Sequence, residues 1–318
     1  RLKKNVARCR RKQNRYMLNH LKNVGGQAVI EGVMMKSPKG WAVAVRDPKG
    51  EIQVKKEPLP GLPKAFKLPV LRGVVTLYHA LSLGIRALSF SANVAVPEED
   101  KQGKPEKQPG KAAITATLAL SMLLGIALFI LFPLYLTKLA GGLFASINSK
   151  AVLFNLVDGV IRVAVFLLYV VLIGLWKDIR RVFEYHGAEH MVIHAYEKDG
   201  KLEMDTIKRM SPLHPRCGTS FLLIVMVTSM LVFSFIPQSW PIVFKFLSRV
   251  ILIPLIAGLS YEALKLSARL KDNPLMRLVI VPGLFLQKLT TRRPNEDQLQ
   301  VAARALNEVL SMEGEDAR

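Results

Sequence analysis

The hydrophobic positions of this chain gather in four long runs instead of the short periodic segments of a soluble core. Ala112–Leu136 has 25 residues without a charge, and about 20 apolar residues are enough for a helix to cross the hydrocarbon layer of a membrane. Thr219–Pro237 is a second uncharged run, and Ala151–Trp176 and Ile242–Leu264 are interrupted runs. The pattern predicts four transmembrane helices within residues 112–267.

The charges inside the interrupted runs need a reason, because charged side chains are costly in a membrane. Asp158 and Arg162 lie four residues apart, so they can pair on one face of a helix. Lys245 and Arg249 weaken the fourth run. Paired intramembrane charges also line transport pathways, and a transporter is therefore the third functional hypothesis.

A different pattern precedes the apolar runs. Short alternating segments at Gln27–Met35, Trp41–Arg46 and Glu51–Lys56 are separated by Ser-Pro-Lys-Gly and Asp-Pro-Lys-Gly. Proline sets φ and glycine accepts a positive φ in such turns. Residues 24–57 are therefore expected to form a small three-stranded β meander.

The remaining segments are assigned from their composition. Residues 58–96 are Pro-rich and then apolar with interspersed charges, as in an amphipathic segment at the membrane interface. Residues 97–111 form a flexible linker, and 268–318 hold a re-entrant or surface segment followed by a helix over Asn295–Met312. We therefore expect a mainly α membrane protein with about four transmembrane helices, the β meander and a His/Glu-bearing amphipathic helix on the cytoplasmic side.

The formal charge of +21 follows the proposed topology. Lys and Arg concentrate before Ala112, in residues 177–218 and after Leu264. The loops that join the other runs, residues 137–150 and 238–241, hold few. The positive-inside rule then places both termini and residues 177–218 on the cytoplasmic side of a bacterial membrane, or on the stromal side of a plastid-type membrane. The basic arm of residues 1–23 fits a transit-peptide remnant, an arm that contacts anionic lipid or RNA and ribosomes, or an ordinary flank.

The two cysteines, Cys9 and Cys217, exclude a disulfide framework. Both lie on the expected cytoplasmic side, where a reducing compartment favours thiols.

The sharpest chemical motif is His186-Gly-Ala-Glu189-His190, on a helix expected over Lys177–Lys198. Two imidazoles four residues apart share a helix face, as metal ligands do, and the H-x-x-E-H order is that of the inverted zinc peptidases. Glu189 is better placed to take a proton from water than to bind the same ion. The alternative is a helix on the membrane with a polar His/Glu face toward water.

Three further places offer candidates. His214 and Cys217 could complete a tetrahedral metal site, or Cys217 could be a nucleophile with His214 as its base; a buried structural thiol is the alternative. Glu262, at the end of the fourth run, is a candidate downstream metal ligand. Glu31 lies in the first strand between glycines and is a candidate catalytic carboxylate or a solvated strand residue.

Several motifs also resemble one family. Gly25–Met35, Arg72–Val75, Tyr185–His190, His214–Phe221 and Pro282–Thr291 occur in the order typical of YqhQ-like proteins. These are bacterial and plastid-type membrane proteins of unknown function that are described as predicted metal-dependent enzymes. The resemblance runs from about residue 24 to residue 312 and implies a polytopic membrane protein. Met191 departs from the family pattern, which often has Lys there, and residues 1–23 fall outside it.

Two functions are therefore expected, besides the transporter. The first is a membrane metal-dependent hydrolase, of the peptidase type, with Zn²⁺ or another divalent transition metal at the cytoplasmic membrane face. The second is a non-enzymatic assembly or docking factor with a structural metal site and a basic surface. A catalytic site keeps one metal position open, whereas a structural site is closed by four protein ligands.

The charge distribution makes a topological prediction. Both termini and the 177–218 loop should lie on one side of the membrane, because Lys and Arg cluster there. Single cysteines introduced at His186 and Ala145 should react with impermeant reagents from opposite sides. Labelling of both positions from the same side would contradict the four-span topology.

Overall fold

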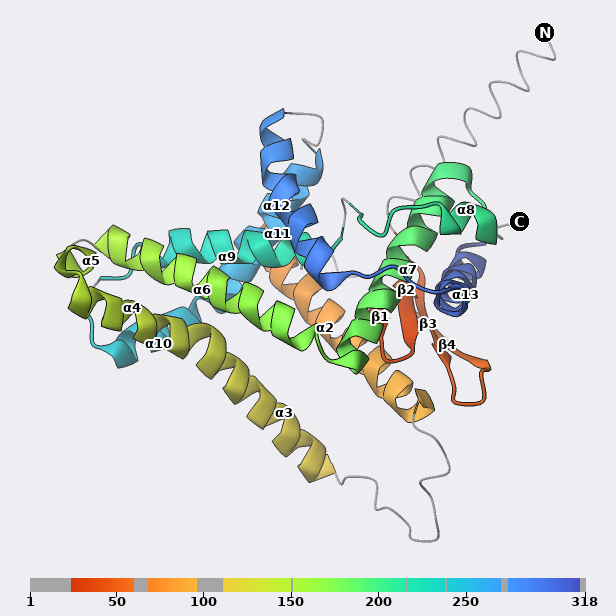
Figure 1. Cartoon of the computed structure of the whole chain (residues 1–318), viewed down its shortest axis with the longest axis horizontal. Coiled ribbons are helices and arrows are strands. Elements are labelled where there is room, and N and C mark those ends of the chain that lie inside the picture. Colours follow the sequence, from red (N-terminus) through yellow and green to blue (C-terminus); the bar gives the residue numbers. More distant parts are fainter. Residues whose placement is uncertain are drawn as a thin grey trace.

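The computed structural model describes residues 24–59, 68–95, 111–149, 151–214, 217–237, 239–269 and 274–314. The expected basic arm (1–23) and nearly all of the expected linker (97–110) lie outside these residues. The described part is mainly helical, with one small sheet. In Figure 1 a helical bundle extends to the left, and the sheet lies at the right beside α7 and α13.

The sheet has four strands where the alternation predicts three. Its antiparallel order is β1-β2-β3-β4, with bounds Gly25–Val29, Gly32–Lys36, Gly40–Arg46 and Ile52–Pro58. The expectation of a single strand over Gln27–Met35 is wrong, because the chain reverses at Ile30-Glu31 and pairs Val29 with Gly32. Glu31 takes the positive φ (50°) of this turn, a place where glycine, asparagine or aspartate is usual. The turn therefore has no ordinary sequence signal.

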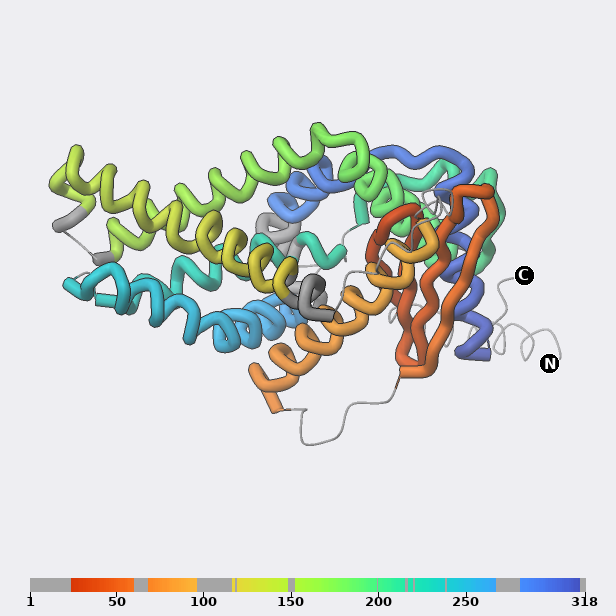
Figure 2. Tube along the Cα trace, turned by 90° about the horizontal axis from the view of Figure 1, so that it is seen from below, coloured from red at the N-terminus to blue at the C-terminus, as the bar shows by residue number. Residues whose placement is uncertain are grey.

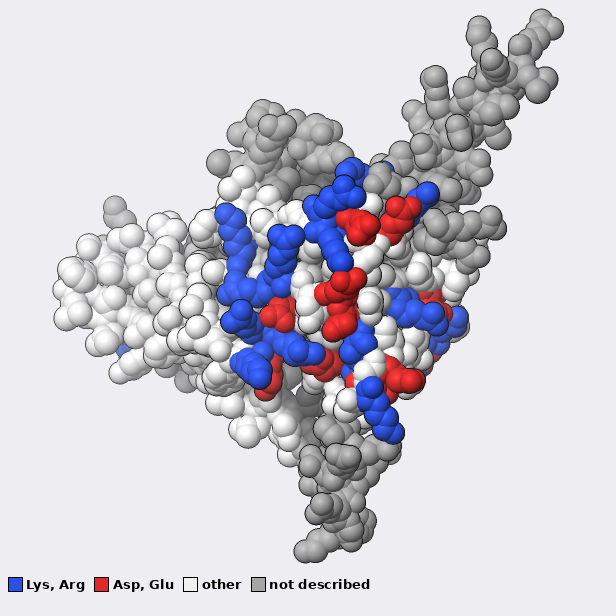
Figure 3. Space-filling model, turned by 45° about the vertical axis from the view of Figure 1, so that its right-hand side comes forward, with Lys and Arg blue, Asp and Glu red and all other residues white. Residues whose placement is uncertain are grey.

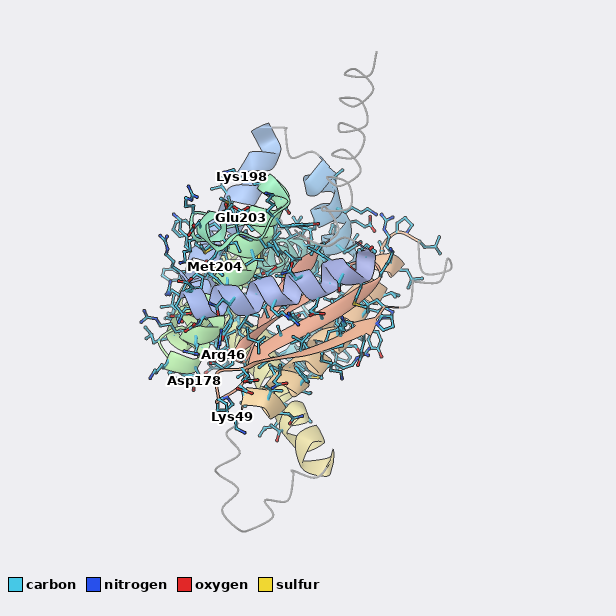
Figure 4. All side chains as sticks on the ribbon, turned by 90° about the vertical axis from the view of Figure 1, so that its right-hand side faces the viewer. Arg46, Lys49, Asp178, Lys198, Glu203 and Met204 are labelled. Atoms are coloured by element: carbon cyan, nitrogen blue, oxygen red, sulfur yellow. The ribbon has the colours of Figure 1, made fainter. Side chains whose placement is uncertain are left out.

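Both faces of the sheet are buried. Val33, Met35, Ala42 and Ala44 point into one core with α7 (Lys177–Asp199) and α13 (Glu296–Glu313). The alternate residues, including Trp41, pack with α2 (Leu71–Ala95) in a second core. Figure 2 shows the strands between α2 and α13, and Figure 4 shows α13 lying across the sheet. In β2 and β3 the residues that point to either side of the sheet are apolar, so neither face of these two strands is exposed to solvent.

The two helices that cover the first face of the sheet, α7 and α13, occur where the periodicity predicts them. Helix α7 ends at Gly200, which adopts the left-handed conformation (φ 68°) that helix C-caps favour. Helix α13 starts after Asn295, whose side chain accepts from the Gln298 N–H while the Gln298 side chain accepts from the Asn295 N–H. This capping box satisfies two backbone donors at the helix start.

Three helices are long and apolar enough to cross a membrane: Leu71–Ala95 (α2), Ala119–Leu143 and Val152–Ile173. The second comprises part of α3 (Lys111–Ile126), η3 (Ala127–Leu131) and α4 (Phe132–Leu143), and the third lies within α6 (Ala151–Ile173). Helices α10 (Ile242–Ile251) and α11 (Ile253–Arg269) form a fourth candidate that bends by 48°. These helices indicate a membrane protein. Large apolar side chains cover their outside, and Figure 3 shows charged residues gathered away from the bundle end.

Two of the expected membrane segments differ in the structure. Helix α9 (Thr219–Phe233) has 15 residues, so it is about 22 Å long at about 1.5 Å per residue. That is shorter than the hydrocarbon layer of about 30 Å, and the expected third span is thus a short helix. Helix α2, expected at the interface, meets the length and composition of a span. The remaining helices are α5 (Ala145–Ser149), α8 (Met204–Lys208) and α12 (Pro274–Thr290), which continues through Pro282.

The chain between α12 and α13 crosses α7 in close contact. The Arg292 N–H donates to the Phe183 carbonyl at 2.9 Å. A Cβ on Gly187 would collide with the Arg292 carbonyl oxygen and touch Pro294. Gly187 therefore lets the crossing segment approach the helix backbone next to His186.

Gly187→Ala should destabilise the protein by about 1–3 kcal/mol, because the added methyl meets backbone that cannot move freely. Gly125→Ala is a matched helical control with nothing within 4 Å of the added Cβ. The control should be neutral or slightly stabilising, as alanine favours helix by about 1 kcal/mol. Thermal unfolding in detergent measures both, and equal melting temperatures for the two variants would contradict the crossing contact.

Candidate metal centre

Three side chains from two helical regions converge on one point. One ligand atom each of His186, His190 and Cys217 lies within 4.8 Å of the other two. The His186 Nε2 to Cys217 Sγ distance is 3.3 Å. Neighbouring ligand atoms of a tetrahedral zinc ion are about 3.3–3.8 Å apart when the metal–ligand distances are about 2.0–2.3 Å. The spacing of these atoms therefore fits a shared ion.

The two imidazoles are held by their other ring nitrogens. His186 Nδ1 lies 2.9 Å from the Thr290 carbonyl oxygen, and His190 Nδ1 lies 2.5 Å from the Pro212 carbonyl oxygen. A carbonyl can only accept, so each Nδ1 carries the proton, and each Nε2 keeps a lone pair in the neutral ring. His190 Nε2 is buried and makes no hydrogen bond to a described nitrogen or oxygen atom, and the Cys217 thiol is the side chain that interacts with its ring. Backbone carbonyls commonly orient metal-binding histidines in this way.

Cys217 reaches the histidines through the chain that follows α7. Residues 200–214, which include α8, fold back along the helix so that the Pro212 carbonyl meets His190. The Cys217 N–H then donates to the His214 carbonyl at 3.2 Å. At the start of α9, the Thr219 N–H donates to Cys217 Sγ at 3.4 Å, and the Thr219 hydroxyl lies 3.2 Å from the sulfur. These contacts fix the position of the sulfur at the start of α9.

His214 lies beside the three converging residues. Its ring centroid is 5.7 Å from that of His190 and 4.4 Å from that of His194. Its Nε2 lies 3.5 Å from a Glu197 carboxylate oxygen. The buried Gln287 side chain holds the His214 backbone by donating to its carbonyl and accepting from its N–H, both at 2.9 Å. The structure thus pairs Cys217 with His186, and His214 is not the imidazole in contact with the thiol.

Glu189 points to the sheet side of the cluster and is 5% exposed. The Gly26 N–H donates to its carboxylate. Gly26 permits this approach, since a Cβ there would lie 2.9 Å from Glu189 Cγ and 2.6 Å from the Met34 carbonyl oxygen. A Glu189 oxygen is 3.6 Å from His190 Nε2, the nitrogen that faces the cluster. The carboxylate therefore borders the space that the ligand atoms share.

Burial sets the protonation of this region. It lowers the pKa of the His190 and His214 imidazoles, an effect that Cys217 and Glu189, respectively, oppose. Burial also raises the pKa of the Glu189 carboxyl, against the influence of His186, His214 and the Gly26 N–H. Neutral imidazoles are the form that binds metals. The raised pKa of the Glu189 carboxyl is closer to the pKa of an effective general base at neutral pH.

The other two candidate carboxylates have separate partners. Glu31 forms a two-point ion pair with Arg181, one contact of which is 2.6 Å, and accepts a 3.2 Å bond from the Tyr185 hydroxyl. Glu262 forms a two-point ion pair with Arg72. The structure therefore brings neither Glu31 nor Glu262 to the His/His/Cys cluster. Glu31 joins the β1–β2 turn to α7, and Glu262 joins α11 to α2.

Three residues of the centre carry no motif that predicts their role. Pro212 and Thr290 act through backbone carbonyls, and Gln287 acts through the backbone of His214. A carbonyl is present at every position, so side-chain identity gives no signal for the first two. Gln287 and Thr290 lie in Pro282–Thr291, one of the stretches that resemble YqhQ-like proteins, and this resemblance is the sequence signal for them.

The fold and the cluster describe a helical protein with membrane-spanning candidates and a potential metal centre. The chain matches the family model "Protein of unknown function (DUF1385)" over residues 68–312. It is 34% identical over 299 residues to "Uncharacterized protein YqhQ" of Bacillus subtilis (strain 168), with 91% of this chain and 92% of that protein covered. No solved structure matches the chain. The protein belongs to the DUF1385 family, as its resemblance to YqhQ-like proteins predicts.

The geometry separates the candidate ligands experimentally. If zinc occupies this cluster, His190→Ala and Cys217→Ala should each lower bound zinc at least about tenfold, because each removes one of the three candidate ligands. Glu262→Gln should retain the zinc of the native protein, because Glu262 pairs with Arg72. Elemental analysis of detergent-purified protein measures all three. Loss of zinc in Glu262→Gln with retention in Cys217→Ala would reverse the assignment.

Proposed function

We propose that this protein is a membrane-bound, zinc-dependent hydrolase with its site at the cytoplasmic membrane face. His186, His190 and Cys217 would hold the metal and leave one position open. Glu189 would serve as the general base. The proposed substrate class is peptides, because H-x-x-E-H is the motif order of a class of zinc peptidases.

The observation that carries this proposal is the orientation of the imidazoles. Thr290 and Pro212 occupy both Nδ1 atoms, so the Nε2 lone pairs of His186 and His190 are available on the side where Cys217 lies. The buried His190 Nε2 makes no hydrogen bond to a described nitrogen or oxygen atom, which is costly unless something binds it. A metal ion satisfies it and its neighbours together.

Charge balance supports the same occupant. Glu189 is buried, its described partners are a backbone N–H and nearby imidazoles, and burial favours the neutral form of His190 and His214. An uncompensated buried carboxylate is costly. A divalent cation together with the Cys217 thiolate and the Glu189 carboxylate would be neutral overall. The cluster is therefore better balanced with a divalent metal than without one.

The chain's own residues define the proposed chemistry. When bound, zinc supplies Lewis acidity that polarises a carbonyl and acidifies water. Glu189 would accept a proton from the attacking water and pass it to the leaving group, since its oxygen borders the cluster at 3.6 Å from His190 Nε2. His214, on the neighbouring side and oriented by Gln287, would contact the substrate.

A second candidate function is that of an enzyme with Cys217 as its nucleophile, and a separate observation supports it. Cys217 Sγ is 3.3 Å from His186 Nε2, while His186 Nδ1 is held by the Thr290 carbonyl. This is the arrangement of a thiol nucleophile, its base and the group that orients the base.

Alkylation of the thiol distinguishes the two functions. In a Cys9→Ser background, bound zinc should protect Cys217 from alkylation, and removal of zinc by a chelator should expose it. Rapid alkylation at full zinc occupancy would favour the nucleophile.

Glu189→Gln separates catalysis from structure. It should preserve zinc content and melting temperature but lower hydrolysis of a quenched-fluorophore peptide mixture by about 10² or more, because it removes the proton acceptor. Glu203→Gln, at a side chain 64% exposed, is the matched control and should be unchanged. Complementation of a strain that lacks the protein provides the second readout.

Two outcomes would oppose the hydrolase proposal. Full zinc, stability, hydrolysis and complementation in Glu189→Gln would remove Glu189 as the base. A zinc-loaded native protein without hydrolytic activity, closed by a fourth protein ligand, would favour the docking or assembly function instead.

A further inference from the structure

A few basic residues lie within the part of the bundle that is remote from the sheet, where most of the described residues are uncharged. In residues 127–173 and 219–256, the described basic side chains are Lys138, Arg162, Lys245 and Arg249, and Asp158 is the one described acid. Helices α4, α6 and α10 carry them, at the left of Figure 1. Topology places most Lys and Arg of such proteins at the opposite, cytoplasmic end. The excess positive charge here therefore needs a local reason.

Asp158 is already fully used by the two arginines. One carboxylate oxygen accepts from Arg162 at 2.8 Å, and the other accepts from Arg249, which is 1% exposed, at 3.1 Å. Both guanidinium groups also lie over the Phe233 ring, at 5.0 and 5.1 Å from its centroid. Among the described residues, their Nε atoms are buried without a hydrogen-bond partner. With two arginines and one aspartate, this network has a net positive charge.

A cavity lies one helical turn from that network. It has a volume of about 560 Å³ and is lined by Leu134, Phe154 and Trp240, among others, with Lys138 and Lys245 on its wall. The Lys245 ammonium lies 4.7 Å from the Phe154 ring centroid and is repelled by Lys138 and Arg249. Neither lysine forms an ion pair with an acid in the described part of the chain. The cavity thus combines apolar walls with unneutralised cations.

The surroundings of the cavity identify its occupant. Tyr135, Leu139 and Phe244, on the helices that line it, are 60%, 55% and 58% exposed, as expected of side chains that face acyl chains. A ligand that arrives through such a surface must be amphipathic, with apolar chains and an anionic group. We propose that this cavity binds the phosphate headgroup of an anionic phospholipid. Lys138 and Lys245 contact the phosphate, and Phe154 and Trp240 contact its glycerol and acyl portions.

The test is lipid binding by the full-length protein in detergent. Delipidated protein is titrated with phosphatidylglycerol, and bound lipid is counted by native mass spectrometry. Phosphatidylcholine and inorganic phosphate form separate arms. The native protein should retain one tightly bound phosphatidylglycerol, and Lys138→Gln/Lys245→Gln should weaken that site by about tenfold or more, because each basic side chain adds favourable interaction with an anionic headgroup. Lys177→Gln/Lys288→Gln removes as many charges outside the cavity lining and should leave the site intact.

Three results would overturn the proposal. These are unchanged affinity in the Lys138/Lys245 variant, equal retention of phosphatidylcholine, and occupancy by inorganic phosphate that displaces the lipid. If the double variant unfolds, the single change Lys138→Gln, at an exposed position, decides the matter by the same titration. Because no metal ligand is altered, zinc content in these variants keeps this test separate from that of the hydrolase.

Discussion

Two hydrogen bonds from imidazole to backbone carbonyl control the geometry of the cluster. Thr290 and Pro212 belong to segments about 80 residues apart in the chain, yet both reach one face of α7. If either carbonyl moved, its imidazole could rotate and its Nε2 would leave the point shared with Cys217. The contacts that the 290–294 segment and the 200–214 segment make with α7 are therefore a condition for the site. Gly187 is the position that allows the first of these segments to come close.

Helix α7 joins the two halves of the molecule because its faces have different partners. One face contacts the sheet, where Glu31 binds Arg181 and Tyr185 and the Gly26 N–H binds Glu189. The other face carries His186 and His190 toward the start of α9. Glu189 lies between these faces, so its carboxylate is held by the sheet while it borders the cluster. In the proposed enzyme, this rigid helix would supply two of the three metal ligands and the base, as the fixed geometry of a catalytic site requires.

The sequence predicts the parts of this structure that depend on local spacing. The i, i+4 histidines and the helices over Lys177–Lys198 and Asn295–Met312 follow local patterns, and they occur as expected. The β1–β2 turn escapes prediction because Glu31 occupies a conformation that usually selects glycine or asparagine. The choice of Cys217 over Glu262 as the third converging residue depends on contacts across 31 residues and on the Arg72 partner of Glu262. Spacing alone contains neither fact. The sequence predicts that Asp158 pairs with Arg162, but only the packing of α10 brings Arg249 to the same carboxylate.

X-ray absorption at the zinc edge of the detergent-purified protein tests the central claim most directly. If His186, His190 and Cys217 hold the ion, the spectrum should show one sulfur at about 2.3 Å and two imidazole nitrogens at about 2.0–2.1 Å. One further light atom should complete the shell, as expected of a site with an open position. A first shell without sulfur, or with three imidazoles and no exchangeable light atom, would contradict the account.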